Sequence, residues 1–137
     1  MLDQNLGTIQ GSKTGPLYFD IYSNDLNHLF NAGECLLYAD DVALTFVGDD
    51  IVKLVQQVNQ RLDQILDWCR FNKMSINATK SEYILVTNKK IAFAPAIFLG
   101  TNQIVRKKSV KYLGIYIDDK LKFQDHLTFL KNKLAQL

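Results

Sequence analysis

The sequence is poor in several residues and patterns that mark whole classes of protein. Its two cysteines, Cys35 and Cys69, lie far apart without Cys-x-x-Cys spacing, which argues against a disulfide framework and fits a reducing compartment. The two histidines, His28 and His126, are equally isolated, so we predict that neither is a metal ligand. Only two prolines and a hydrophobic fraction of 47% argue against a disordered chain. Because no signal peptide and no apolar run long enough to span a membrane is visible, we expect an intracellular protein with no membrane contact.

The net charge is small, but the charges are unevenly distributed along the chain. Residues 1–50 contain one lysine and eight acids, whereas residues 51–137 contain 15 basic and six acidic residues. Such a division suits an enzyme that holds cations in one region and a phosphate backbone in another. The densest basic segment is Arg106–Lys108 with Lys111 nearby, and a solvated surface loop is an equally good interpretation of it.

Among the features that are present, the segment Tyr38–Asp41 is the most informative. It places two adjacent carboxylates, Asp40 and Asp41, between the short apolar runs Leu36–Leu37 and Val42–Leu44. Runs of this kind predict two strands with the acids at the turn of a hairpin. Carboxylates are the ligands that hard cations such as Mg²⁺ prefer, and shared carboxylates allow two ions to lie close together.

Two other acid pairs have simpler interpretations. Asp49-Asp50 precedes an apolar stripe of helical period, so we predict that it begins a helix from about Asp50 to Phe71. Asp118-Asp119 is predicted to form a turn.

The context before the first pair distinguishes it from the others. Gln10–Phe19 contains Gly-Ser and Gly-Pro, which mark a loop, and Pro16 favours a helix beginning there and continuing to about Phe30. This loop, a helix carrying Ile21–Leu26 and then Tyr38–Asp41 together resemble the palm of a reverse transcriptase of the non-LTR (LINE-type) retrotransposon branch.

The resemblance continues downstream, from about Gly7 to His126. Trp68, Asn72–Asn77 and Lys80-Ser81 resemble the segment that follows the long palm helix of this family. Val110–Asp118, followed by Leu121 and His126, resembles its primer-grip strand and the connection beyond.

The fold implied by the resemblance is a partial polymerase palm, of the α+β class, with an antiparallel sheet and helices packed on one face. The residues themselves predict further strands at Glu82–Thr87, at Ile91–Leu99 with an interruption at Pro95, and at Val110–Ile117, where Gly114 marks a bulge or a close approach. Helical spacing of leucines predicts a last helix from about His126.

The activity implied by the resemblance is RNA-directed DNA synthesis with two Mg²⁺ ions, or Mn²⁺ in their place. The implied partners are an RNA template, a DNA primer and deoxynucleoside triphosphates, and the implied location is the nucleus or a cytoplasmic ribonucleoprotein. Asp40 is implied as the main metal ligand and Asp41 as its weaker neighbour, and Lys80 is implied to face the departing pyrophosphate. The implied template, nucleotide and primer contacts are Gln10, Gly11, Ser12, Tyr38 and Ala39, with Tyr112, Leu113 and Gly114 as the primer grip.

The sequence departs from the family pattern upstream of the loop. A further metal-binding Asp is expected a full strand and helix earlier, and Asp3 is too close to Gln10 to serve as that ligand. The fingers are missing and the thumb is at most begun, so we expect residues 1–137 alone to be an inactive part of the polymerase. Two alternatives stay open: a remnant that binds nucleic acid without chemistry, and a remnant that does not fold stably.

Overall fold

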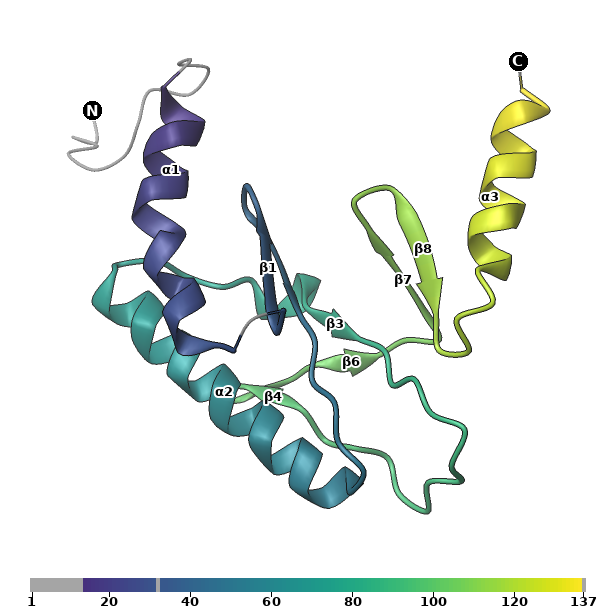
Figure 1. Cartoon of the computed structure of the whole chain (residues 1–137), viewed down its shortest axis with the longest axis horizontal. Helices are drawn as coiled ribbons and strands as arrows, with labels where there is room; N and C mark the ends of the chain where they lie inside the picture. Colours follow the sequence, from purple (N-terminus) through teal and green to yellow (C-terminus); the bar gives the residue numbers. More distant parts are fainter. Residues whose placement is uncertain (1–13, 32, 137) are drawn as a thin grey trace. The chain divides into compact units, whose positions relative to one another are not determined.

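The computed structural model describes residues 14–31 and 33–136, and Figure 1 shows helices together with short strands. The chain divides into two compact units, one ending at Leu54 and the other beginning at Val55, and each unit is described by itself. The mixture of helices and small ladders agrees with the predicted α+β class. No helix in the described part of the chain is both long and apolar enough to cross a membrane.

The first unit begins with the helix α1 (Gly15–Ser23), which continues into the 3-10 helix η1 (Asn24–Leu29). Proline in the first turn favours this start, because its missing N–H has no partner to lose there. The hydroxyl of Ser23 donates to the carbonyl of Phe19 at 2.9 Å, and Leu26 is the buried residue of η1. The predicted helical segment to about Phe30 is therefore confirmed, with its second half wound more tightly.

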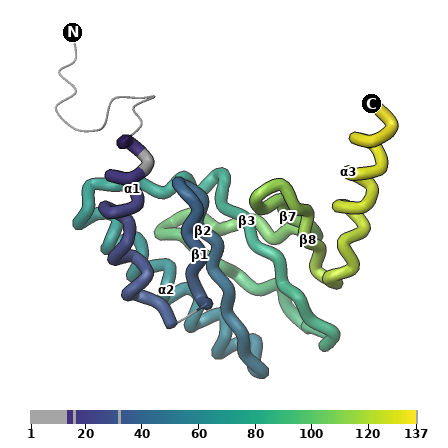
Figure 2. The backbone as a smooth tube through the Cα atoms, turned by 45° about the horizontal axis from the view of Figure 1, so that its top comes forward, coloured from purple at the N-terminus to yellow at the C-terminus, as the bar shows by residue number. Residues whose placement is uncertain are grey.

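A β-hairpin completes the first unit and is visible in Figure 2. Strand β1 (Cys35–Tyr38) pairs antiparallel with β2 (Asp41–Leu44), from Cys35 opposite Leu44 to Tyr38 opposite Asp41. The amide of Thr45 donates to the carbonyl of Glu34 at 2.8 Å and extends the ladder by one bond. The predicted hairpin is confirmed, with Asp40 in its turn and Asp41 as the first residue of β2.

The helix α2 (Ile51–Phe71) begins and ends with satisfied backbone groups. A carboxylate oxygen of Asp50 accepts from the amides of Val52 (2.8 Å) and Lys53 (3.2 Å), which confirms the predicted helix start. At the other end Lys73 has a φ of 53°, and the amides of Lys73 and Met74 donate to the carbonyls of Arg70 and Cys69. This is a Schellman motif with lysine at the position that glycine usually occupies.

The middle of the second unit contains little regular structure. The 3-10 helix η2 (Ala78–Lys80) precedes β3 (Glu82–Tyr83), which pairs parallel with β6 (Val105–Arg106). Strand β4 (Phe98–Leu99) pairs antiparallel with β5 (Asn102–Gln103). The longer strands predicted at Glu82–Thr87 and Ile91–Leu99 are therefore wrong in extent, since only their ends are paired. Pro95 has no N–H to give to a ladder, and its carbonyl instead accepts from the Tyr83 hydroxyl at 2.6 Å.

The prediction of one strand over Val110–Ile117 is also wrong. The segment folds into a hairpin, with β7 (Ser109–Tyr112) antiparallel to β8 (Ile115–Asp118). Leu113 and Gly114 form its two-residue turn with φ values of 46° and 84°, the pattern of a type I′ turn. Gly114 is thus a turn residue, and of its two predicted roles, a bulge or a point of close approach, the bulge is wrong.

The last helix, α3 (Gln124–Leu134), begins close to the predicted position and packs on β8 (Figure 1). The rings of Tyr116 on β8 and Phe129 on α3 lie 5.4 Å apart. Asp118 ends β8 and its carboxylate accepts from amides that follow it, which confirms the turn predicted at Asp118-Asp119.

The strands do not form the single antiparallel sheet that was predicted. The described residues form four two-stranded ladders, three antiparallel and one parallel. Two of these ladders contain only two residues in each strand, which is too short to recruit a third strand without further support.

Candidate functional site

The acid pair lies at the tip of the β1–β2 hairpin. Tyr38 and Asp41 form the last pair of the ladder, so Ala39 and Asp40 make up the two-residue turn and Asp41 opens β2. Both carboxylates are exposed, and neither has a hydrogen bond or ion pair with another described residue. The hairpin therefore presents two adjacent, uncommitted carboxylates to solvent.

Ala39 makes this tip conformationally unusual. Its φ of 51° lies in the left-handed region, which a residue with a Cβ occupies at a cost of roughly 1 kcal/mol. Two-residue hairpin turns need positive φ at their first position, and glycine or asparagine commonly supplies it. The turn is formed nevertheless, with the methyl group of Ala39 on one side of Asp40 in the sequence and the carboxylate of Asp41 on the other.

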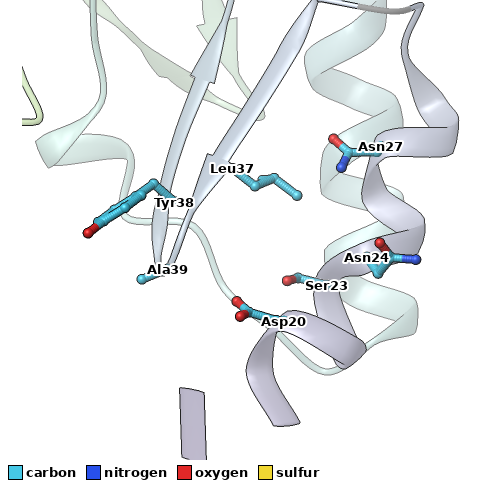
Figure 3. A pocket seen from close by; sticks show the side chains of 7 residues that line it. All are labelled: Asp20, Ser23, Asn24, Asn27, Leu37, Tyr38 and Ala39. Atoms are coloured by element: carbon cyan, nitrogen blue, oxygen red, sulfur yellow. The ribbon is translucent and has the colours of Figure 1, made fainter. Parts of the chain in front are cut away.

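A cavity of about 500 Å³ lies in the first unit beside the hairpin tip (Figure 3). Four of its lining residues come from the α1–η1 segment and three from β1 and the turn: Asp20, Ser23, Asn24 and Asn27, then Leu37, Tyr38 and Ala39. Leu37 points from β1 toward the helix, whereas the ring of Tyr38 points to the other side of the strand. The cavity thus combines one carboxylate, two amides and a hydroxyl with an apolar wall.

The four helical lining residues were not among the predicted site residues, although Ser23 and Asn24 belong to the segment Ile21–Leu26 that carries the resemblance. Their numbers, 20, 23, 24 and 27, recur at steps of three and one, which places them on one helical face. This row of polar residues on one face of a helix, followed in sequence by an acidic hairpin, is the pattern from which they could have been predicted. Ser23 is the most buried of the four, at 7% exposure.

Lys80 lies in the second unit, as the last residue of η2, and its side chain is exposed. The turn that carries it is fixed by Asn77, whose side-chain oxygen accepts from the Thr79 amide at 3.1 Å and from the Thr79 hydroxyl at 2.6 Å. The structure therefore places this ammonium group at a defined point with its three donors available to solvent.

The residues predicted as a primer grip lie together at the tip of the β7–β8 hairpin. Tyr112 is half-buried at the end of β7, and the side chain of Leu113 is 48% exposed. A Cβ atom added to Gly114 would contact no other atom. One residue away from Tyr112, the ammonium of Lys111 lies over the rings of Tyr116 (5.7 Å) and Phe129 (5.4 Å). This tip presents apolar surface with a cation on its flank.

The basic segment Arg106–Lys108 is exposed in the same unit. The ammonium of Lys107 pairs with the carboxylate of Glu82 at 3.4 Å, and both side chains are close to half exposed. Burial raises the pKa of Tyr83, and the neighbouring Arg106 partly offsets that rise. An exposed ion pair of this kind contributes little to stability, so most of the positive charge remains available to an anionic partner.

The structure brings together only some of the predicted site residues. Tyr38, Ala39, Asp40 and Asp41 share one hairpin, and Tyr112, Leu113 and Gly114 share another. Lys80 lies on an element of its own in the second unit. Gln10, Gly11 and Ser12 lie outside the described residues.

The two carboxylates at the hairpin tip are chemically suited to a divalent cation, but they are few for a metal site. Asp40 and Asp41 offer carboxylate oxygens, the ligands that Mg²⁺ prefers, and no other described residue bonds to them. Within residues 14–31 and 33–136, no three or more acidic, histidine or cysteine side chains gather as a metal site would need. Two carboxylates can anchor an ion, and further oxygens have to come from elsewhere.

Comparison with known proteins identifies the family. The reverse transcriptase (RNA-dependent DNA polymerase) family matches residues 2–117. The RNA-directed DNA polymerase from mobile element jockey of Drosophila funebris is 31% identical over 134 residues, covering 92% of this chain and 14% of the relative. A Pol polyprotein from the type-1 retrotransposable element R1 of Bradysia coprophila is 29% identical over 139 residues, covering 98% of this chain and 14% of that relative.

A probable RNA-directed DNA polymerase from transposon X-element of Drosophila melanogaster is 28% identical over 93% of this chain. The chain spans about 14% of the length of each of these three relatives. No solved structure gave a significant match. The family match nevertheless covers most of the chain, so the chain belongs to the reverse transcriptase (RNA-dependent DNA polymerase) family, as its motifs predicted.

Proposed function

We propose that this chain is the palm part of an RNA-directed DNA polymerase of a non-LTR retrotransposon, which transfers nucleotides to a primer along an RNA template. One observation carries the proposal: a chain of this family holds two uncommitted carboxylates, Asp40 and Asp41, at the tip of a hairpin.

Asp40 and Asp41 are proposed to hold the divalent ions of the reaction, with Asp40 as the main ligand. Two bound Mg²⁺ ions would supply activation of the primer hydroxyl and stabilisation of charge on the leaving oxygens. The contribution of the hairpin is preorganisation, because the ladder from Cys35 to Tyr38 fixes the backbone on both sides of the acids. The small side chain of Ala39 leaves room beside them for the primer terminus.

The remaining roles are those that the resemblance to the family implies. Gln10, Gly11, Ser12 and Tyr38 are proposed to line the template and the incoming nucleotide. Lys80, exposed and held by the η2 turn, is proposed to face the departing pyrophosphate as a cation or a proton donor.

At the tip of the second hairpin, Tyr112, Leu113 and Gly114 are proposed to support the primer strand. Apolar and aromatic side chains suit contact with sugar and base, and the open space around Gly114 permits close approach of a strand.

A second candidate function is nucleic-acid binding without chemistry. The exposed cations at Arg106, Lys107, Lys108 and Lys111 favour it, because neutralising phosphates requires only available positive charge. Residues 1–137 alone are proposed to bind and not to polymerise, since the described residues gather only two of the carboxylates that a two-ion site needs.

The test is primer extension by the full-length polyprotein that contains this chain, with Asp40→Asn as the variant. We expect extension on a primed RNA template to fall by at least about a thousandfold, the scale of losing a principal electrostatic group. The control is Asp63→Asn on α2, an exposed carboxylate that has no hydrogen bond with another described residue. Undiminished extension by Asp40→Asn would refute the ligand assignment.

Measuring duplex binding together with primer extension distinguishes the two candidate functions, since both require binding and only the first requires extension. Both variants should retain salt-dependent affinity for a primer–template duplex, because neither removes a cation. A full-length wild-type protein that binds the duplex but fails to extend it would favour the second candidate function.

A further inference from the structure

The connection between β8 and α3 is organised around one side chain, Asp118. Its Oδ1 accepts from the amide of Lys120 at 3.0 Å and from the amide of Lys122 at 3.1 Å. Its own carbonyl accepts from the amide of Leu121 at 3.0 Å. A single residue therefore receives three of the backbone donors in the segment that leads to the helix.

The same carboxylate lies at the end of β8, a few residues before the start of α3. Phe123 is the residue at the N-cap position, and it has no side-chain oxygen to accept from the first turn. The pKa of Asp118 is lowered by backbone donation, from Lys122 most strongly, with Lys120, Phe123 and Gln124 contributing, while burial opposes the shift. A negative charge at this end of a helix also interacts favourably with the helix dipole.

The connection is held in an uncommon backbone conformation. Leu121 and Phe123 have φ values of 52° and 55°, in the left-handed region that residues with a Cβ seldom adopt. Two such residues within three positions persist only where the surroundings determine them. The hydrogen bonds to Asp118 hold this segment, together with the bonds from the Asp119 amide to the Lys108 carbonyl (2.8 Å) and from the Lys120 ammonium to the Thr87 carbonyl (3.1 Å).

Aromatic and cation–π contacts join α3 to the β7–β8 hairpin. Phe129 on α3 contacts Tyr116 on β8, with ring centroids 5.4 Å apart, and stacks on His126 at 6.3 Å. Lys111 lies over both Tyr116 and Phe129, so one cation is shared between the hairpin and the helix. These contacts join α3 to the hairpin and therefore report the position of the helix relative to β8.

We propose that Asp118 is a positioning residue that holds α3 against the β7–β8 hairpin. That this hairpin meets the primer rests on the proposed function, whereas the positioning itself does not. The adjacent acid does not share the role: Asp119 has the same charge, but no described residue donates to its carboxylate. The proposal thus predicts different behaviour from two neighbouring aspartates.

The surroundings of the second carboxylate oxygen of Asp118 indicate which substitution should preserve the position of α3. Oδ2 of Asp118 is shielded from solvent and has no hydrogen-bond partner among the described residues. The same is true of the hydroxyl of Ser109, the residue opposite Asp118 in the β7–β8 ladder. Directly opposed Cβ atoms lie roughly 4.5–5.5 Å apart. In Asp118→Asn the amide oxygen can keep the Lys120 and Lys122 bonds while the NH₂ group faces the Ser109 hydroxyl. Asp118→Ala keeps neither interaction.

The experiment is NMR on the 137-residue chain, comparing Asp118→Ala, Asp118→Asn and Asp119→Ala with the wild type. In Asp118→Ala we expect hydrogen-exchange protection of the Lys122 amide to fall roughly tenfold or more, and the ring contact between Tyr116 and Phe129 to disappear. Cross-strand contacts of β7 with β8 and the helical contacts within α3 should persist. Asp118→Asn and Asp119→Ala should keep the ring contact.

Three results would overturn the proposal. The first is a persistent Tyr116–Phe129 contact in Asp118→Ala. The second is loss of the hairpin and helix together with that contact, which would make the residue a general stability determinant. The third is equal behaviour of Asp118→Ala and Asp119→Ala. None of these measurements involves polymerisation, so a failure of the proposed function would leave them unaffected.

Discussion

Asn59, in the middle of α2, connects that helix to the irregular segment before β4. Its Nδ2 donates to the carbonyl of Ala96 at 3.1 Å, and its Oδ1 accepts from the amide of Phe98 at 2.8 Å. One amide side chain thus fixes both sides of the buried residue Ile97 across a separation of more than 35 positions in sequence. Asn59→Ala removes both bonds and leaves two backbone groups without their partner.

The expected loss can be worked out from these two bonds. A typical hydrogen bond contributes roughly 0.5–1.5 kcal/mol net, so the pair contributes about 1–3 kcal/mol. The abandoned amide of Phe98 is close to solvent and can bind water, which limits the additional penalty. Alanine also has the higher helix propensity, by roughly half a kcal/mol, and this offsets part of the loss. We therefore expect a decrease of about 2 kcal/mol in the free energy of unfolding.

The assay is urea denaturation followed by the fluorescence of Trp68, the single tryptophan of the chain, which lies on α2 nine positions after Asn59. The control is Gln60→Ala, an exposed amide one position further along the same helix, which should change stability by no more than about 0.5 kcal/mol. Equal effects of the two substitutions would refute the view that Asn59 fixes the β4 segment to α2. A loss confined to Asn59→Ala would support it.

Three further predictions concern the ends of the elements. Lys73→Gly should raise the free energy of unfolding by up to about 1 kcal/mol, because glycine adopts the φ of 53° without strain; an unchanged urea midpoint would contradict this. Asp50→Ala should lower it by about 1 kcal/mol through loss of the α2 cap, with a correspondingly lower thermal midpoint. The pKa of Asp118 is below its ordinary 3.8 in the folded chain, so its contribution is full above about pH 4 and is lost as the pH falls through the folded value. Acid unfolding of Asp118→Asn should accordingly depend less on pH below about pH 4 than that of the wild type.

Sequence patterns predicted the elements that rest on local chemistry. The helical period of residues 51–71 and the capping carboxylate of Asp50 are local signals, and both were read correctly. The hairpin at Tyr38–Asp41 was also predicted, because two apolar runs separated by acids leave few other arrangements.

The failures arise where the usual turn residues are absent. The Val110–Ile117 segment reads as one strand because Leu113, an apolar residue, occupies a turn position that Asn or Asp commonly fills. Glu82–Thr87 has the composition of a strand, but pairing needs a partner, and only Glu82 and Tyr83 find one, in Val105 and Arg106.

Sequence motifs predicted functional residues on two hairpins and did not include the polar side chains of the cavity wall. Motifs identified Asp40, Asp41 and the Tyr112–Gly114 tip, because each is a contiguous string of residues. The polar wall of the cavity, from Asp20 to Asn27, is spread over two helical turns, so its members share a face only after the helix is formed.

Both long hairpins carry a strained residue at the position where the proposed chemistry needs a particular side chain. Ala39 and Leu113 have φ values of 51° and 46°, and glycine would satisfy either backbone with less strain. Stability alone therefore favours other residues at both tips. The proposed contact of each tip with a bound strand would explain the methyl group beside Asp40 and the exposed leucine at the second tip. Strained backbone conformations are common at residues that contact a ligand. The other described residues with a Cβ and a positive φ, Lys73, Leu121 and Phe123, lie at a helix end and in the connection before α3, so the two hairpin tips are the positions for which a ligand contact is the proposed reason.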